Sequence, residues 1–154
     1  MHKTLLLLVL LTAPLYAATR PVTTFADLLS ALEQGRMVRA VIHYGECRLF
    51  VDGKEDTTVA AVGGMPLWPY EYFPAHLMGN PKGFLVSSAT NLISHRKYGH
   101  VYNYVKLKLY DDGEVELTAR YLHPKSYKIK MDETFKGRLS TKEGEGGIYL
   151  FIEE

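Results

Sequence analysis

The sequence predicts an α+β domain, in which one N-terminal helix packs on a strongly bent, mostly antiparallel sheet or partial β-barrel. Three observations support this fold class. One apolar stripe with helical spacing occurs early, and a series of segments with alternating polarity, rich in β-branched and aromatic residues, follows it. A long hairpin at residues 99–122 forms the centre of that series. Residues 18–154 have the length of a single domain.

Residues 1–17 have the pattern of a secretory signal peptide. A basic start with Lys3 precedes an apolar run over residues 4–16, and Ala17 and Ala18 are small enough for cleavage between them. The run is shorter than the roughly 20 residues that span a membrane. We expect a secreted or extracellular protein, periplasmic if the source is Gram-negative, with no membrane span after cleavage. An uncleaved N-terminal anchor is the alternative.

Charge and cysteine content narrow the classes of function. Lys and Arg number 18 against 17 Asp and Glu, and loss of Lys3 brings the formal charge of the mature chain to zero. A neutral chain without a long basic run is not expected to bind nucleic acid. Cys47 is the only cysteine, so the exported domain has to fold without an internal disulfide. We expect it to be buried, and pairing between chains or thiol reactivity is the alternative.

Thr24 begins the predicted helix and Gly35 ends it. The Thr24 hydroxyl can accept a hydrogen bond from the amide of Asp27, whose carboxylate favours the positive end of a helix. The apolar stripe consists of Phe25, Leu28, Leu29 and Leu32. Because a helix of about ten residues is marginal alone, the stripe is expected to pack on the sheet.

The remaining strands are predicted from alternation and from turn residues. Residues 37–44 form the first strand, which continues through Val51 into a turn at Asp52–Gly53. Residues 59–83 are broken up by glycine and proline, apart from an edge strand over residues 67–73, where proline is tolerated. Further strands are predicted at residues 84–94, 127–131, 135–139 and 148–152, which brings the number to about seven.

The register of the hairpin follows from its apolar positions. A three-residue loop over residues 111–113 keeps the valines and leucines of both strands on one face, whereas a two-residue loop mixes the faces. The predicted pairs are Leu109–Val115, Leu107–Leu117 and Val105–Ala119 on the inner face, and Tyr110–Glu114, Lys108–Glu116, Lys106–Thr118 and Tyr104–Arg120 on the outer face. Gly113 supplies the left-handed residue of the loop.

Four stretches resemble the VirK family of small exported proteins. They are TFADLLSALEQGRMVRAVIHYGEC from Thr24, GGM from Gly63, YNYVKLKLYDDGEVELTARYL from Tyr102 and HPKSYKIKMDETF from His123. The resemblance implies export, small size and, in plant-associated bacteria, a link to virulence gene sets. It implies no established activity and no catalytic residues. Many family members carry a second cysteine near the position of Gly137, and its absence here leaves Cys47 without that partner.

No catalytic pattern stands out, so the sequence leans against an enzyme and predicts no metal and no cofactor. The histidines form no H-x-H or H-E-x-x-H arrangement, and the serine pair at residues 87–88 lacks the G-x-S-x-G turn. On one continuous strand Cys47 and His43 would lie about 13 Å apart, too far for a hydrogen bond. The rival hypothesis is an enzyme, hydrolase-like, whose site combines His95, His100 and nearby carboxylates.

We predict a non-catalytic binding protein, itself a monomer or weak dimer. The candidate binding residues are Trp68, Tyr70, Tyr72, Tyr102, Tyr104 and Arg120. Aromatic rings at a sheet edge can stack on a sugar, a lipid tail or a side chain, so the partner is an unknown protein, a glycan or a small amphipathic ligand. An exposed edge can also recruit a peptide as an added strand. The alternatives are that the rings close the end of the core, or that the protein is structural and self-associating.

Overall fold

The computed structural model describes residues 19–142 and 144–153, so the predicted signal peptide lies outside the described residues. The elements in chain order are β1 (Thr19–Val22), α1 (Phe25–Glu33), β2 (Val38–His43), the 3-10 helix η1 (Tyr44–Glu46), β3 (Arg48–Val51), β4 (Lys54–Asp56), β5 (Val62–Pro66), β6 (Tyr70–Phe73), β7 (Phe84–His95), β8 (Gly99–Tyr110), β9 (Glu114–Leu122), β10 (Ile129–Leu139) and β11 (Gly147–Glu153). The described chain is therefore mostly strands, with one α-helix on its N-terminal side.

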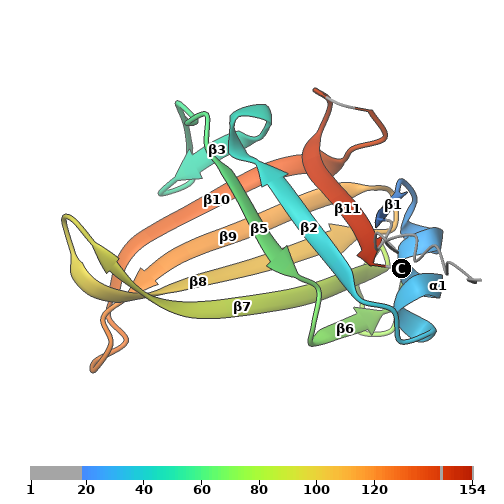
Figure 1. Cartoon of the computed structure of the whole chain (residues 1–154), viewed down its shortest axis with the longest axis horizontal. Coiled ribbons are helices and arrows are strands. Elements are labelled where there is room, and N and C mark those ends of the chain that lie inside the picture. The colour runs from blue at the N-terminus through green and yellow to red at the C-terminus, as the bar shows by residue number, and fades with distance from the viewer. Residues whose placement is uncertain (1–18, 143, 154) are drawn as a thin grey trace, which may run out of the picture.

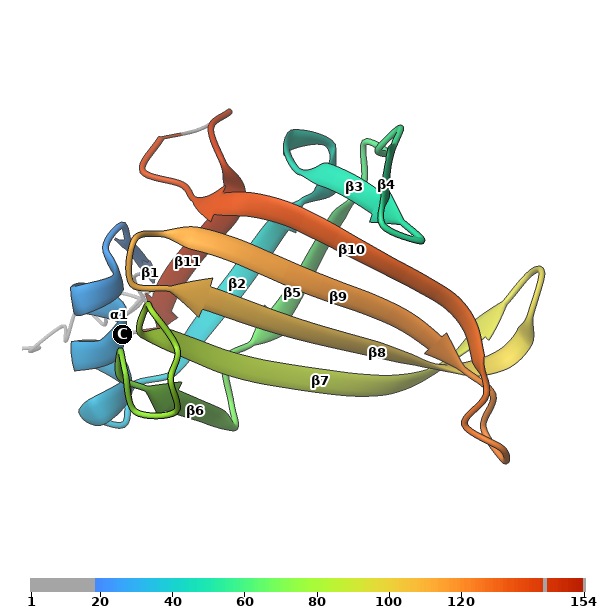
Figure 2. The ribbon, with the colours of Figure 1, turned by 180° about the vertical axis from the view of Figure 1, so that it is seen from behind.

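All eleven strands belong to one sheet that curls into a half-barrel. Its main path runs in the order β5-β2-β11-β10-β9-β8-β7-β6, while β1 pairs with β11, and β3 pairs with β10 and β4. The pairings are antiparallel except for that of β10 with β11, which is parallel. Figure 1 looks onto the inner side, where β2, β5 and β11 cross in front of the long strands β7 to β10. Figure 2 shows the outer side of those long strands.

The helix has the predicted ends and the predicted apolar side. The amide of Asp27 donates to the Thr24 hydroxyl at 3.1 Å, and Gly35 adopts the left-handed conformation with φ of 73°. Leu28 and Leu32 are buried together with Ala31, whereas Leu29 is half-buried. The helix thus contributes to the core through one side. No helix among the described residues is long and apolar enough to cross a membrane.

The hairpin formed by β8 and β9 has the predicted register. Leu107 lies opposite Leu117 and Lys108 lies opposite Glu116. The exposed fractions of the two leucines are 0% and 1%, so the predicted inner face is the buried one. Gly113 has φ of 82°, and its amide donates to the Tyr110 carbonyl at 2.9 Å, which closes the three-residue loop.

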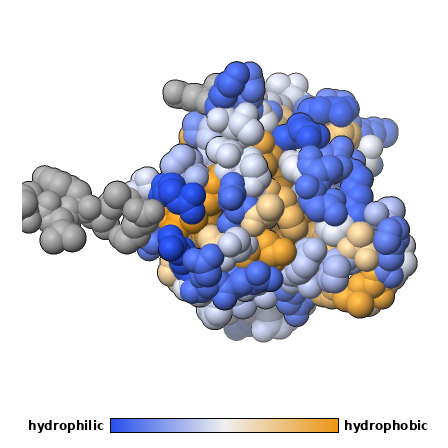
Figure 3. All heavy atoms as spheres, turned by 90° about the vertical axis from the view of Figure 1, so that its right-hand side faces the viewer, coloured by the Kyte–Doolittle hydropathy of each residue, from blue (hydrophilic) through white to orange (hydrophobic). Residues whose placement is uncertain are grey.

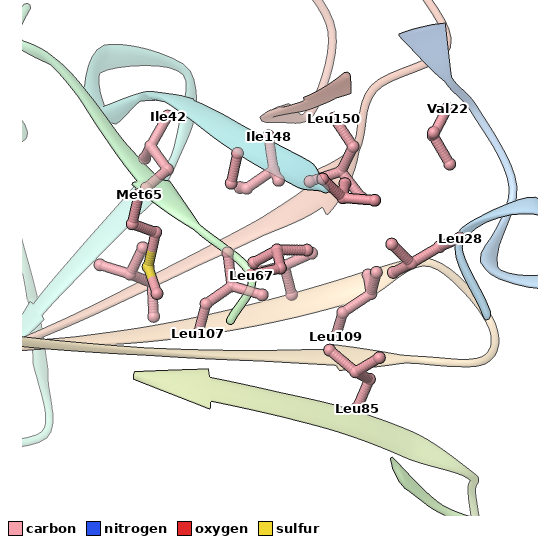
Figure 4. Packing of buried hydrophobic residues seen from close by; sticks show 14 of the residues in the cluster. Val22, Leu28, Ile42, Met65, Leu67, Leu85, Leu107, Leu109, Ile148 and Leu150 are labelled. Carbon is pink, nitrogen blue, oxygen red and sulfur yellow. The ribbon is translucent and has the colours of Figure 1, made fainter. Parts of the chain in front are cut away.

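The core lies between the inner face of the long strands and the strands that cross them. Figure 4 shows Leu107 and Leu109 of β8 in one cluster with Ile148 and Leu150 of β11 and with Leu28 of α1. Each such leucine contributes about 1.5 to 3 kcal/mol when it is fully removed from water. The three-way packing of helix, crossing strands and long strands holds the half-barrel in its curled shape.

The structure corrects the prediction that residues 45–51 continue the first strand. The 3-10 helix η1 turns the chain after β2, and β3 pairs with β10 instead. Cys47 therefore lies beside His43, and its Sγ donates to the His43 carbonyl at 3.6 Å. The distance of about 13 Å expected for an extended chain was wrong, because the glycine at position 45 lies in a turn and not in a strand.

Three further differences concern strands. β1, β4 and β5 were not predicted, because β1 and β4 are only four and three residues long and β5 contains Gly63 and Gly64. The two strands expected at residues 127–131 and 135–139 are a single strand, β10, with a bulge between Ile129 and Met131. The edge strand predicted at residues 67–73 is present as β6, shorter than expected, at the end of the sheet path.

Candidate functional site

The inner face of the long strands is buried near α1 and uncovered toward the opposite end. Along β7, Leu85 and Ser87 are buried, Ala89 is half-buried and Asn91 is exposed, although all four lie on the inner side. In Figure 1, β2 and β5 cross over the half nearer to α1, and the long strands extend beyond them. The uncovered half is therefore a sheet surface that the core does not use.

Polar side chains lie side by side on this uncovered half. Register places Asn91 opposite Asn103, Asn103 opposite Tyr121, and Tyr121 opposite Met131, in one row across four strands. The next row toward α1 consists of Ala89, Val105, Ala119 and Glu133. We name the surface made by Asn91, Asn103, Tyr121 and Glu133 the open inner face. Within the described part of the chain, neither asparagine side chain has a hydrogen-bond partner.

Glu133 gives the open inner face its charge. Partial burial raises the pKa of this carboxyl above its usual value, and the nearby carboxylate of Asp56 raises it further. Burial also raises the pKa of Tyr44, whose ring packs edge-on against Phe135 with centroids 4.7 Å apart. Tyr44 also interacts electrostatically with Tyr121 and Glu133, so it lies at the boundary between the covered and uncovered halves.

Aromatic rings border the far end of the open inner face. The His95 ring lies 4.9 Å from the rings of both Tyr98 and Tyr121, and Tyr98 and Tyr121 are 5.9 Å apart. Nδ1 of His95 accepts a hydrogen bond from the Lys97 amide at 3.2 Å, which fixes the ring. Val101, on the same side of the sheet, is fully buried. The rings are thus held in place by contacts with one another and with the sheet.

Three of the predicted binding residues lie on the outer face of the long strands. Tyr104 lies opposite Arg120, whose Nε donates to the Asp132 carboxylate at 2.9 Å. The Tyr102 ring stacks on Tyr127, with centroids 6.3 Å apart and planes within 8°. Exposed apolar side chains continue this surface across the sheet tip, with exposed fractions of 58% for Leu92, 65% for Tyr127 and 48% for Ile129.

The other three predicted residues lie on the opposite side of the sheet, near α1. Tyr72 lies opposite the buried Leu85, and its ring is 5.8 Å from that of Phe25 in the helix. Tyr70 is half-buried, and its ring lies 5.9 Å from that of Trp68, which is 59% exposed. The structure therefore does not join the six predicted residues into one surface, and their binding role stays a prediction.

The histidines of the rival enzyme hypothesis point to opposite faces. His95 lies opposite Gly99, and His100 lies opposite Ser94, so the two rings are on different sides of the hairpin. Among residues 19–142 and 144–153, no three His, Cys, Asp or Glu side chains gather as metal ligands would. Burial, aided by the charge of Glu46, raises the pKa of Cys47 to about 11, so its thiol is protonated at neutral pH.

A hollow of about 780 Å³ lies on the outer face, and five cationic and three acidic side chains line it. Lys108 and Lys136 flank Glu116 in one row across the strands. Lys82 donates to Glu114 at 2.8 Å and also pairs with Asp112. Lys82 therefore has carboxylate partners, whereas the amine of Lys108 lies over the ring of Phe84 and that of Lys136 over the ring of Phe50.

Apolar side chains are also exposed at the end of the molecule near α1. Leu77 and Met78, in the loop between β6 and β7, are exposed. Figure 3 shows that the apolar residues on this side form separate patches with hydrophilic residues between them. A second hollow, of about 360 Å³, is lined by residues of β1, β2 and β11 and by residues 140–142, with Pro21, Val41 and Phe151 among its apolar lining residues. The second hollow also has polar lining residues, among them His43, Lys142 and Tyr149.

Residues 21–127 match a family model described as VirK protein. The chain belongs to the VirK family. A crystal structure of a VirK family protein from Legionella pneumophila is similar, with a TM-score of 0.64 and 14% sequence identity, over 85% of this chain and 98% of that chain. At that identity the likeness concerns the fold alone. No curated protein matches the chain. The family resemblance drawn from the sequence is confirmed.

Sequence reasoning missed the open inner face, although one signal for it was present. Inner-face positions of β8 read Val101, Asn103, Val105, Leu107 and Leu109, so a single amide interrupts an apolar series. In β9, Tyr121 interrupts the inner series in the same row. Such an interruption indicates where the inner face of the strand no longer packs in the hydrophobic core. The sequence did not show which strands cover the other half.

Proposed function

We propose that this VirK family member is an exported, non-catalytic binding protein that binds a carbohydrate on its open inner face. The observation that supports this is the row formed by the exposed Asn91 and the half-buried Asn103 and Tyr121, on the part of the long strands that β2 and β5 do not cross. Each asparagine amide offers two donors and an acceptor, which suits the vicinal hydroxyls of a sugar. The neighbouring rings of His95 and Tyr98 suit the apolar face of a sugar ring.

Other ligand classes fit the open inner face less well. A lipid tail would remove the two amides from water without giving them hydrogen bonds, at a cost of about 1 to 3 kcal/mol for each group. An anionic ligand would meet the carboxylates of Glu133 and Asp56. A neutral polyhydroxylated ligand avoids both penalties, because it offers hydrogen bonds without charge.

Export is the second part of the proposal. The basic start, the apolar run and the small residues at positions 17 and 18 support secretion. In a Gram-negative source the destination would be the periplasm or the medium. Glycans of the cell envelope or of a host surface are available there, which suits the link to virulence gene sets that the family resemblance implies in plant-associated bacteria.

A printed glycan array, followed by titration calorimetry with the strongest oligosaccharide hit, tests carbohydrate binding. Asn103→Ala is expected to weaken that affinity about tenfold, because loss of one or two hydrogen bonds costs about 1 to 2 kcal/mol. Asn91→Ala should act in the same direction. Tyr104→Ala is the matched control, because Tyr104 is the next residue of β8 and lies on the outer face.

Two results would contradict the proposal. One is the absence of any saturable glycan binding by the folded protein. The other is loss of binding in Tyr104→Ala with full binding in Asn103→Ala, which would move the site to the outer face. That face is the second candidate, for a partner protein, because Leu92, Tyr127 and Ile129 form an exposed apolar surface around Tyr102.

A further inference from the structure

Strand β7 has a long unpaired edge. On the side away from β8, it is paired with β6 only at residues 84–87. From Ser88 to His95, no other strand of the described chain lies along that edge. The unpaired stretch is twice as long as the segment that β6 covers.

The alternation of hydrogen bonds between β7 and β8 shows which backbone groups of β7 have no partner in the sheet. The Asp111 amide donates to the Gly83 carbonyl at 3.0 Å, so this opposite pair is a hydrogen-bonded one. In an antiparallel ladder such pairs alternate with pairs whose N–H and C=O point to the other side. The residues of the unpaired stretch that direct both groups away from β8 are Ser88, Thr90, Leu92 and Ser94. All four are exposed.

This edge lacks the usual protection against pairing with another strand. Exposed edges normally carry charged residues, proline or a bulge. The stretch from Ser88 to Ser94 contains no charged residue and no proline, and its pairing with β8 continues without a register shift. The opposite edge of the sheet is different, because β5 is only five residues long and ends at Pro66.

We propose that two copies of this chain associate through antiparallel pairing of their β7 edges. The register that uses all four free residues places a two-fold axis at Asn91. It pairs Ser88 with Ser94 of the second copy and Thr90 with Leu92 of the second copy. The edge is then self-complementary, and the formal charge of zero expected for the mature chain adds no repulsion between copies.

The same register gives a neighbour to Trp68. The Ser87 hydroxyl donates to the Pro69 carbonyl at 2.8 Å, so the exposed Trp68 lies where β6 ends and the free edge begins. In the paired dimer, the second copy's strand has to leave the edge after Ser94, beside Trp68, because Tyr70 of β6 already lies opposite Ser87. The dimer therefore covers both the free backbone groups and an exposed indole, which is the chain's only tryptophan.

Analytical ultracentrifugation over a concentration series tests the proposal with the purified mature protein. The wild type is expected to dimerise, with a shift of tryptophan emission to shorter wavelength as the dimer forms. Thr90→Pro removes a free N–H without removing a bond to β8, so it should keep the fold and raise the dimer dissociation constant at least a hundredfold. Thr90→Val retains the N–H and should dimerise as the wild type does.

A cysteine variant keeps the test decisive if Thr90→Pro does not fold. Across the two-fold axis, the two Asn91 Cα atoms would be about 4.5 Å apart, within the range of a disulfide. Asn91→Cys should therefore give a cross-linked dimer under mild oxidation. Asn103→Cys, one strand farther from the axis on the same face, should not. Equal cross-linking by both variants would overturn the proposal. A wild type that remains monomeric at all concentrations would also overturn it. The β7 edge would then be free to pair with a peptide from another protein.

Discussion

The surroundings of Cys47 explain why glycine occupies two positions that are distant in sequence. A Cβ atom added at Gly137 would lie 3.0 Å from the Cys47 sulfur, and one added at Gly147 would lie 2.5 Å from it. The thiol thus fills the space that two side chains would otherwise take. The Cys47 sulfur is also close enough to bond to a cysteine introduced at position 137.

Gly137→Cys is expected to form a disulfide with Cys47. In a disulfide, each Cβ lies about 3 Å from the sulfur across the bond, because the S–S bond is about 2.05 Å long. The carbonyl oxygen of Gly146 and Cδ1 of Ile148 would lie 2.6 and 2.8 Å from the new Cβ, so the backbone at Gly146 and the Ile148 side chain have to shift. Oxidation should leave no free thiol by Ellman titration and should raise the thermal midpoint above that of the reduced variant.

Gly137→Ser is the matched control for that experiment, because it adds a group of similar size without the bond. It is expected to be less stable than the wild type at all redox potentials. Two free thiols after complete oxidation of Gly137→Cys would show that position 137 does not face Cys47 as described.

The thiol of Cys47 should make stability depend on pH in the alkaline range. Burial raises its pKa to about 11 from 9.0, so the unfolded chain loses this proton first. The stabilising effect is complete below pH 9 and is lost as the pH rises to 11. Tyr44, with its pKa also raised, acts in the same direction. Urea denaturation from pH 8 to 11 should show a smaller decline in Cys47→Ala than in the wild type, and parallel curves would contradict this assignment.

At the scale of elements, the hairpin and the helix were predictable because their signals are local. The alternation of leucines and lysines in β8 fixes its faces, and Thr24 and Gly35 fix the ends of α1. β5 was not predictable, because Gly63 and Gly64 form a strand only where β2 supplies a neighbour. The candidate site was the least predictable feature, since it depends on which half of the long strands the crossing strands cover.

The two faces of β8 should differ sharply in their effect on stability. Leu107→Ala is expected to reduce the free energy of unfolding by about 2 to 5 kcal/mol, because it leaves a cavity in the core. Lys108→Ala, on the outer face, should cost less than about 1 kcal/mol. Urea denaturation at pH 7 measures both values. Equal losses would mean that the faces of the hairpin are assigned wrongly.

For the whole molecule, the sheet leaves a curved scaffold with two different exposed surfaces. The inner surface carries amides and a carboxylate, while the outer surface carries an apolar tip around Tyr102 and an ion pair between Arg120 and Asp132. Because adjacent residues of one strand serve the two surfaces, single substitutions can separate their roles.

The mature protein recovered from the medium or periplasm of a secreting host should begin at Ala18. Intact mass spectrometry should show the loss of residues 1–17, because the small residues on either side of that bond suit signal peptidase. Ala17→Pro, which blocks the bond, is the control and should retain the full length. A full-length wild type in the membrane fraction would favour the uncleaved anchor.

The position of β11 has a consequence for biogenesis. Although its residues come late in the chain, this strand lies inside the sheet between β2 and β10 and also pairs with β1. A nascent polypeptide therefore lacks the central partner of its earliest strands until residues 147–153 have been translated. We expect a chain that ends before residue 147 to lack this partner and to be degraded readily by proteases.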